Sequence, residues 1–329
     1  MPESPDPARQ LIPVSPALTP SERFQLPALI EEAGQGAAQR FIEFFTASIA
    51  NRNTRMAYAR AVRQFLSWCE ARGLSLHHIQ PVHVAAYREQ HTGSPATIKQ
   101  HLAAIRMLFD YFVTGQVIPM NPAASVRGPK HVVESGKTPI LDAEEARALL
   151  DAIDTAAISG LRDRAIIGVM LYSFARVSAV TGLLVGDYYP KGKRWMLRLH
   201  EKGGKVKDLP VHHKAEAYLD KYLDAAGIRE SRKTPLFRTL TRKRGLSERA
   251  LHRNNVTAMI KRRAKAAGLP AERICSHTFR GSGITNYLMN GGQIETAQAI
   301  AGHASPRTTK LYDRRHQQIA LSEIERIRI

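Results

Sequence analysis

Residues 301–312 read Ala-Gly-His-Ala-Ser-Pro-Arg-Thr-Thr-Lys-Leu-Tyr, and they follow a second polar motif, His277-Thr278-Phe279-Arg280. A phenol with an ordinary pKa of about 10 is a weak nucleophile at neutral pH, so Tyr312 needs a nearby base or cationic groups to form its phenolate. His277 and Arg280 are three residues apart, which places them on one face if their segment is helical. The two motifs together favour a tyrosine that attacks a phosphodiester, with arginine to neutralise the phosphate oxygens.

The charge balance indicates a polyanionic partner. Lys and Arg total 48 against 29 Asp and Glu, a formal net charge of +19 over 329 residues. Such an excess most often marks a nucleic-acid-binding protein, with an anionic membrane as the rival partner. No run of about 18 apolar residues predicts a membrane span, and the start (residues 1–20) lacks the order of a signal peptide. Cys69 and Cys275 are far apart and fit a reducing compartment, so a cytosolic protein is expected.

The chain divides into two predicted domains with an arm and a linker. Prolines crowd residues 1–35, which predicts an extended or disordered arm. Apolar residues at three- and four-residue steps predict a small helical domain over residues 36–120, and its basic residues could face DNA or could simply be solvated helix faces. Turn-forming pairs predict a linker over 121–139, before a catalytic domain at 140–329 whose tail begins at 313.

The second domain is predicted to be helical with a small β-sheet. Asp142 begins a helix by its capping pattern, and a long apolar helix follows over Arg162–Ser173. Alternation from Trp195 to Val211 predicts a hairpin with Lys202 at its turn, and Ser276–Leu288 is predicted to be a helix. The fold class is therefore mainly α with a small β-sheet.

These motifs, taken in order, are similar to those of the tyrosine recombinases of the phage-integrase family. The resemblance spans about residue 37 to Tyr312. It implies an N-terminal helical core-binding (SAM-like) domain and a C-terminal α+β catalytic domain that together form a C-shaped DNA clamp. Its elements are an arginine box, a lysine in a β-hairpin turn, a His-x-x-Arg motif, a Gly-His pair and the tyrosine, which correspond here to Arg176, Lys202, His277 with Arg280, Gly302-His303 and Tyr312.

The resemblance also implies a role for each of these residues. Tyr312 would attack the phosphate and form a 3′-phosphotyrosyl link, without metal or cofactor. Arg176 and Arg280 would hold the non-bridging oxygens, and His303 would donate a further hydrogen bond. His277 would help to remove the tyrosine proton, and Lys202 would protonate the departing 5′ oxygen.

Some features leave alternatives open. The family usually has an acidic residue three positions after its first arginine, where this chain has Ala179, so another group is needed to orient Arg176 or His277. Lys205 is a second candidate for the turn lysine. Each site residue alone has an ordinary structural explanation, and only their joint order favours catalysis. A zinc site at Cys275, His277 and His303, or at His212-His213, lacks a fourth ligand at sensible spacing.

The resemblance further implies a site-specific recombinase that acts through a Holliday junction, for integration, excision or resolution. Its partners would be double-stranded DNA with inverted half-sites, a second copy on each site, four copies in the synapse, and accessory DNA-bending proteins in some systems. Its place would be the bacterial cytoplasm, at the nucleoid. The tail's apolar stripe could pack on a neighbouring copy or on its own domain. The alternatives are a type IB topoisomerase-like enzyme and a non-catalytic DNA-binding protein.

Overall fold

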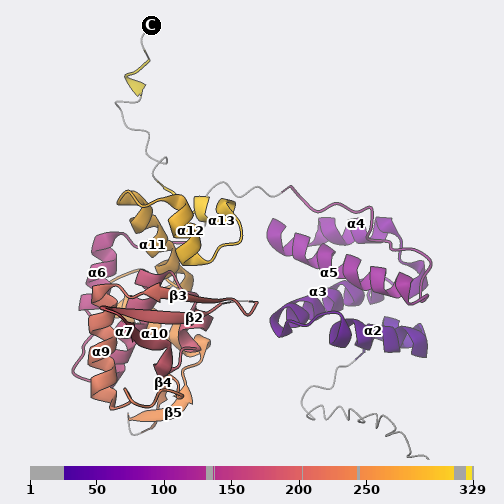
Figure 1. The fold of residues 1–329 in the computed structure, drawn as a ribbon. Coiled ribbons are helices and arrows are strands. Elements are labelled where there is room, and N and C mark those ends of the chain that lie inside the picture. The colour runs from indigo at the N-terminus through magenta and orange to yellow at the C-terminus, as the bar shows by residue number, and fades with distance from the viewer. Residues whose placement is uncertain are drawn as a thin grey trace, which may run out of the picture. The chain divides into compact units, whose positions relative to one another are not determined.

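The structure is a computed structural model that describes residues 26–130, 136, 138–201, 203–242, 245–314 and 324–327. The chain separates into two compact units, residues 1–132 and 133–329, each with its own apolar core. Figure 1 shows both units as ribbons. Within the described ranges, no helix combines the length and apolar character needed to cross a membrane.

The first unit is entirely helical in its described part. Its longest helices, α3 and α5, pack through aromatic side chains, with the rings of Phe65 and Phe109 6.1 Å apart in an edge-to-face arrangement. Asn51 and Ser94 cap these two helices by accepting hydrogen bonds from backbone N–H groups of their first turns. The elements are α1 (Ala28–Glu32), α2 (Gln35–Ala47), α3 (Arg52–Glu70), η1 (Leu76–His78), α4 (Pro81–Gln90) and α5 (Pro95–Thr114).

Both ends of the first unit's described chain join its core. Helix α1 lies inside the segment expected to be an arm, and it is ordered because Leu29 and Ile30 are buried among the other helices. After α5, Ala123 and Val126 are also buried, although the sequence places them in the linker. Arg106 donates to the backbone oxygens of both residues and fixes this segment on α5.

The second unit is built around α7, which is buried on most sides. Residues 165–170 of α7 are fully buried, as expected for a central helix with apolar residues all round. The helices around it include α9 and α11. The helical elements are α6 (Ala143–Asp151), α7 (Ile158–Ser173), α8 (Val177–Thr181), η2 (Val185–Asp187), α9 (His213–Ala226), α10 (Arg253–Ala266), α11 (Ser276–Met289), α12 (Ile294–Ala301) and α13 (Pro306–Lys310).

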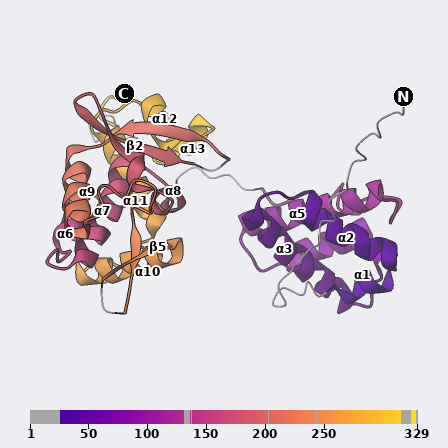
Figure 2. The same ribbon diagram turned by 60° about the horizontal axis from the view of Figure 1, so that its bottom comes forward.

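A three-stranded antiparallel sheet completes the second unit. Its strands β1 (Tyr188–Lys191), β2 (Arg194–His200) and β3 (Val206–Pro210) follow in sequence order, with Leu197 opposite Leu209. Figures 1 and 2 both place β2 beside α12 and α13, so the hairpin lies next to the segment that carries residues 301–312. A separate two-stranded sheet joins β4 (Arg238–Leu240) and β5 (Leu246–Ala250).

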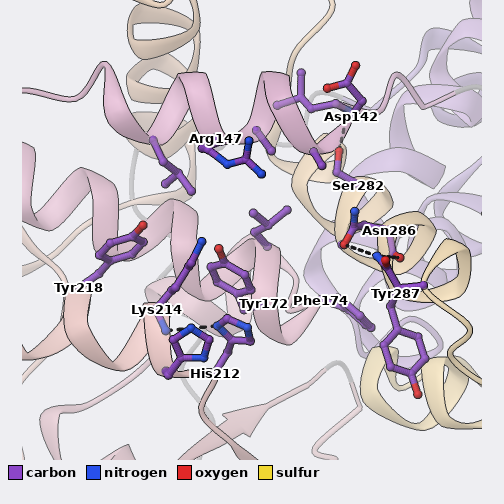
Figure 3. Close-up of a pocket in the computed structure, with 18 of the residues that line it drawn as sticks. Asp142, Arg147, Tyr172, Phe174, His212, Lys214, Tyr218, Ser282, Asn286 and Tyr287 are labelled. Carbon is purple, nitrogen blue, oxygen red and sulfur yellow. Dashed lines mark hydrogen bonds between the residues drawn. The ribbon is translucent and has the colours of Figure 1, made fainter.

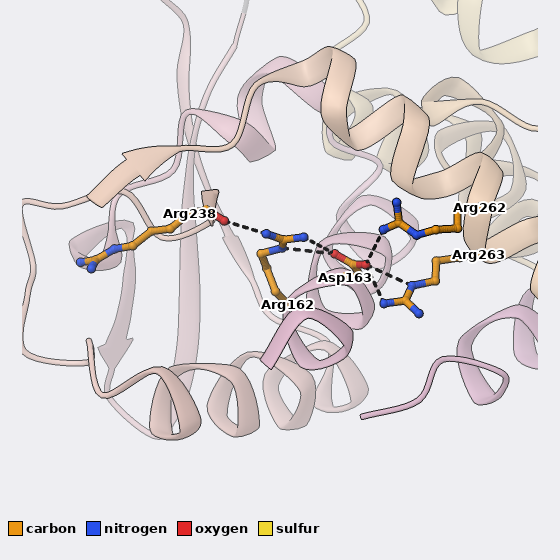
Figure 4. Close-up of polar contacts among 5 residues, drawn as sticks. All are labelled: Arg162, Asp163, Arg238, Arg262 and Arg263. Carbon is orange, nitrogen blue, oxygen red and sulfur yellow. Dashed lines mark hydrogen bonds and ion pairs between the residues drawn. The ribbon is translucent and has the colours of Figure 1, made fainter. Parts of the chain in front are cut away.

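A buried carboxylate ties α7 to α10. Asp163 has no exposed surface, and it accepts hydrogen bonds from Arg162 and from Arg263 at 2.8 Å each, with Arg262 at 3.5 Å (Figure 4). Arg162 also donates to the backbone oxygen of Arg238 in β4. Because a buried charge is stable only when it is paired, this cluster has a structural role in joining three elements.

The sequence predicted the fold class correctly: the protein is mainly α-helical with a small sheet. The predicted helix at 276–288 is α11, and the hairpin from Trp195 to Val211 is β2 and β3. Some predicted features fall on positions that the structure does not describe. These are residues 1–25 of the arm, 131–135 and 137 of the linker, Lys202, and residues 315–323 and 328–329 of the tail.

Candidate active site

Tyr312 follows α13 and is docked against α11 of its own unit. Its backbone oxygen accepts a hydrogen bond of 2.9 Å from the buried hydroxyl of Thr285. Gly281 makes room for the phenol ring, because a Cβ at that position would lie 3.3 Å from the ring carbon Cε1 of Tyr312. Only 8% of Tyr312 is exposed, so its hydroxyl has a defined position and is not a mobile surface group.

The hydroxyl of Tyr312 meets His277. The phenolic oxygen lies 3.0 Å from Nε2 of His277, which is in the first turn of α11. A neutral imidazole with its own proton on Nδ1 accepts the phenol proton in this arrangement. The two groups predicted to be nucleophile and base are thus in direct hydrogen-bond contact, which is the geometry that general-base activation requires.

Arg280 lies behind this pair and is almost completely buried. Its Nη1 donates to the backbone oxygen of Phe174, and its Nη2 donates to that of Ala301 at 2.6 Å. Phe174 ends α7 in the left-handed conformation, with φ 54° and ψ 21°, which is uncommon for a residue other than glycine. This conformation turns the chain between α7 and α8. The carbonyl of the same residue accepts the hydrogen bond from Arg280, so the backbone strain lies at the site.

Arg176 directly precedes α8, two residues after Phe174. It donates from Nη1 to Oε2 of Glu201 at 2.5 Å, and about a third of its side chain (34%) remains exposed. Glu201 also lies 3.5 Å from the ammonium group of Lys207, and Lys207 donates to the backbone oxygen of Ile300 at the end of α12. A groove of about 490 Å³ opens here, lined by Arg176, Glu201, Gly203, Lys205, Val206, Lys207, Ala299, Gly302 and Ala304.

His303 lies beside the ring of the tyrosine. The ring lies parallel to that of Tyr312, with a centroid distance of 6.0 Å and an interplanar angle of 8°. A hydrogen bond of 2.9 Å joins Nδ1 of His303 to the hydroxyl of Thr309. Gly302 precedes it with φ 62°, a left-handed conformation that ends α12 and turns the chain toward the site.

The cationic groups change the acidity of their neighbours. Burial raises the pKa of Tyr312, and the charges of Arg280 and Arg176 act in the opposite direction. For His277, desolvation and the repulsion of the same two arginines lower the pKa below its usual range. The imidazole is therefore neutral near pH 7 and able to accept a proton.

Arg280 and His303 have more strongly shifted pKa values. Burial, with repulsion from Arg176, lowers the pKa of Arg280 to about 10, so the guanidinium stays charged at neutral pH. Burial and the nearby cations Arg280 and Arg176 lower the pKa of His303 to about 4. His303 is accordingly neutral at neutral pH, while the positive charge of the site comes from its arginines and Lys207.

The structure brings five of the six predicted site residues into one place: Arg176, His277, Arg280, His303 and Tyr312. Lys202 lies outside the described residues. Lys205, the second candidate, is exposed in the hairpin turn. No group of three or more His, Cys, Asp or Glu side chains that could hold a metal ion is found over the described ranges.

Sequence reasoning missed Glu201 and Lys207. A usable signal was present for the lysine, because strand alternation puts Lys207 on the same face as Leu209, which packs against the core. No comparable signal exists for Glu201, which lies in the turn region between two strands. Its importance depends on contact with Arg176, which is 25 positions away in sequence.

A larger cavity of about 640 Å³ lies elsewhere in the second unit (Figure 3). It is lined from α6, α7, α9 and α11 and includes Arg147, Lys214 and Asn286. The ring of His212 stacks on Tyr172 at its wall, with centroids 4.1 Å apart. None of the predicted catalytic residues lines this cavity, so the chemistry is assigned by the side-chain geometry around Tyr312 and not by cavity size.

Two sequence profiles of known families match the chain. The sequence profile described as "Phage integrase family" matches residues 139–318, and that described as "Phage integrase, N-terminal SAM-like domain" matches residues 39–115. The tyrosine recombinase XerD of Listeria monocytogenes serotype 4b (strain F2365) is 28% identical over 265 residues, which cover 79% of this chain and 87% of the relative.

Two solved structures share the fold. The XerH site-specific recombinase bound to a palindromic difH substrate, in a post-cleavage complex, has a TM-score of 0.67 at 19% identity, over 92% of this chain and 88% of that one. A lambda integrase tetramer bound to a Holliday junction has a TM-score of 0.61 at 19% identity, over 88% and 83% of the two chains. Because the profile of the catalytic domain alone covers more than half of the sequence, the chain belongs to the phage integrase family and is a tyrosine recombinase.

Proposed function

We propose that Tyr312 is the nucleophile with which this recombinase cleaves and rejoins DNA at specific sites. The observation that carries the proposal is the 3.0 Å contact between the Tyr312 hydroxyl and His277, beside two arginines. In the cleavage step the phenolic oxygen forms a bond to phosphorus, and the bond from phosphorus to the 5′ oxygen breaks. The product is a 3′-phosphotyrosyl link and a free 5′-hydroxyl, and the reverse step restores the strand.

The proton transfers follow from the same contacts. His277 takes the phenol proton as the bond to phosphorus forms, because its lowered pKa keeps the ring neutral. The departing 5′ oxygen needs a proton in return, and we assign this transfer to Lys202 on the family resemblance alone. In the rejoining step His277 returns the proton to the tyrosine.

The two arginines differ in exposure and in hydrogen-bond partners, and so have different roles. Arg176 is partly exposed beside the groove and presents guanidinium donors to a phosphate placed there. Arg280 is 1% exposed, and both its Nη atoms donate to backbone carbonyls. Its Nε is buried without a partner among the described residues, so Arg280 contributes a fixed charge and an N–H group at Nε that a phosphate can accept from. His303 adds a neutral hydrogen-bonding group beside the tyrosine.

We also propose how the protein assembles on DNA. Two copies would bind inverted half-sites, and four would pair two sites and exchange strands through a Holliday junction. The shared fold with the lambda integrase tetramer on such a junction supports this proposal. The helical first unit and the catalytic unit would both grip the duplex as a clamp, helped by the net charge of +19. The reaction would take place in the bacterial cytoplasm, at the nucleoid, with DNA-bending proteins as accessory partners in some contexts.

A two-site plasmid assay tests site-specific recombination against simple relaxation. The supercoiled plasmid carries two copies of the DNA that flanks the protein's own gene, and its control carries none. Site-specific recombination predicts rearranged products only from the two-site plasmid. Relaxation of both plasmids at the same rate, without rearrangement, would support the topoisomerase alternative.

A further inference from the structure

Glu201 is the described acidic residue that contacts Arg176, and it does so from an unexpected element. The first arginine of the family usually has an acidic residue three positions later, where this chain has the buried Ala179. We propose that Glu201 takes the place of this acidic residue. It is the positioning residue that holds Arg176 and Lys207 for phosphate binding. The inference rests on the proposed function of Arg176.

The contacts of Glu201 join three parts of the site. Its carboxylate is only 6% exposed, with Oε2 at 2.5 Å from Nη1 of Arg176 and Oε1 at 3.5 Å from Nζ of Lys207. Its backbone N–H donates to the oxygen of Lys205 at 2.7 Å and closes the end of the hairpin. Lys207 in turn donates to Ile300 in α12. One carboxylate thus connects the α7–α8 junction, the hairpin and the helix that precedes His303.

Charge explains why this contact matters. Arg176, Arg280 and Lys207 lie close enough to influence one another, and burial with the repulsion of the two arginines lowers the pKa of Lys207 while Glu201 raises it. The charge-assisted hydrogen bond to Oε2 fixes one edge of the Arg176 guanidinium and leaves its other donors for an anion. Without the carboxylate, the partly exposed Arg176 would be free to turn toward water and away from the other cations.

Two other carboxylates of this region, Asp187 and Asp208, have partners other than Arg176. Asp187 accepts a hydrogen bond from the backbone N–H of Leu184 at 2.9 Å and lies 3.4 Å from His200. Asp208 pairs with Arg198 on the same hairpin at 3.1 Å.

The test compares Glu201→Gln with the wild type on two nicked DNA substrates. One substrate carries the normal scissile phosphodiester, and the other carries an uncharged methylphosphonate at the same position. Cleavage of the methylphosphonate depends less on arginine because it has no negative charge to neutralise. Asp208→Asn is the matched control, since it removes a carboxylate paired with arginine from the same hairpin. Single-turnover cleavage, DNA affinity and melting temperature are measured for each protein.

A positioning role predicts a loss on the order of 100-fold in cleavage of the phosphodiester by Glu201→Gln, with DNA affinity unchanged within about twofold. The loss on the methylphosphonate should be at least tenfold smaller, and Asp208→Asn should cleave both substrates like the wild type. The ratio of the two rates does not depend on the fraction of folded protein. Equal losses on both substrates, or no loss on either, would overturn the inference. If the wild type itself formed no adduct, the proposed function would fail instead.

Discussion

Among single residues, Tyr312 has to lose a proton and His277 has to be neutral to accept it. The same neighbouring side chains influence the pKa values of both groups. Arg280 and Arg176 make the phenol more acidic and the imidazole less basic, while burial of both rings acts against their charged forms. The result is a neutral pair at rest, joined by one hydrogen bond. A phosphate placed beside the arginines would supply the negative charge that favours proton transfer to His277.

The lowered pKa of His277 predicts the acid side of the pH profile. Protonated His277 cannot accept the phenol proton, so kcat/KM should fall as the pH drops through a value below the ordinary 6.5 of histidine. Replacement by glutamine should remove this acid limb and reduce the rate on the order of 100-fold or more. Cleavage of a nicked substrate by both proteins between pH 5 and 8 is the measurement. An acid limb that persists unchanged in His277→Gln would assign it to another group.

His303 predicts a pH effect on stability. Its pKa of about 4 in the folded protein lies below the ordinary 6.5 of an unfolded chain, so the unfolded state binds more protons between these values. The stability of the catalytic unit should therefore fall as the pH drops from about 6.5 to 4, by up to roughly 3 kcal/mol from this residue. Urea unfolding of the wild type and His303→Gln across this range tests the point. Equal pH slopes in the two proteins would show that His303 is not the source.

At the scale of secondary-structure elements, the crossing of α7 and α11 sets the site geometry. Gly283 in α11 lies against α7 so closely that a Cβ would approach the backbone oxygen of Leu171 to 2.2 Å and the ring of Phe174 to 2.7 Å. Phe174 carries the carbonyl that binds Arg280, which is in α11 itself. The helix contact and the arginine contact therefore depend on the same close approach.

Gly283→Ala is predicted to separate these two helices. Overpacking of this kind costs about 1–3 kcal/mol, and cleavage should fall together with stability because Arg280 would shift. Gly245→Ala is the control, since its nearest neighbour would be the Thr241 hydroxyl at 3.7 Å and its φ is not positive. Thermal melting and single-turnover cleavage are compared for both variants. A Gly283→Ala protein that melts and cleaves like Gly245→Ala would contradict this account of the helix contact.

Elements with strong local signals were predictable, and long-range contacts were not. The capping residues Asp142 and Ser94 identify helix starts, and alternating residues identify the hairpin, because these signals lie within a few positions of one another. The left-handed Phe174 gave no such signal, since it is neither glycine nor asparagine. The bond between Arg176 and Glu201 depends on the hairpin folding back onto the α7–α8 junction, which no local pattern encodes.

In the whole molecule, the proposed nucleophile Tyr312 and the side chains around it lie together in one chain. Tyr312 is fixed to α11 of its own unit by Thr285 and His277, and Arg176 reaches the same place from the start of α8. A single protomer therefore contains all the proposed site residues that the structure describes. The net charge of +19 favours association with a polyanion such as DNA.

A mixing experiment follows from this arrangement. Tyr312→Phe and Arg176→Ala proteins should each fail to form a covalent adduct, and a mixture of the two should also fail, because neither chain holds both groups. Gel separation of denatured reactions on a nicked substrate gives the result. Recovery of the adduct in the mixture would mean that the tyrosine is donated between protomers.

The proposed covalent link between Tyr312 and DNA is tested by trapping an adduct that survives SDS. Wild type and Tyr312→Phe are mixed with nicked duplexes cut from the DNA that flanks the protein's own gene, in the absence of metal. The proposed reaction predicts an adduct from the wild type alone, with both proteins binding the DNA equally well. Sequencing of the trapped ends would locate the crossover site. An adduct from Tyr312→Phe as well would show that another residue is the nucleophile, and binding by both without any adduct would contradict the proposed reaction.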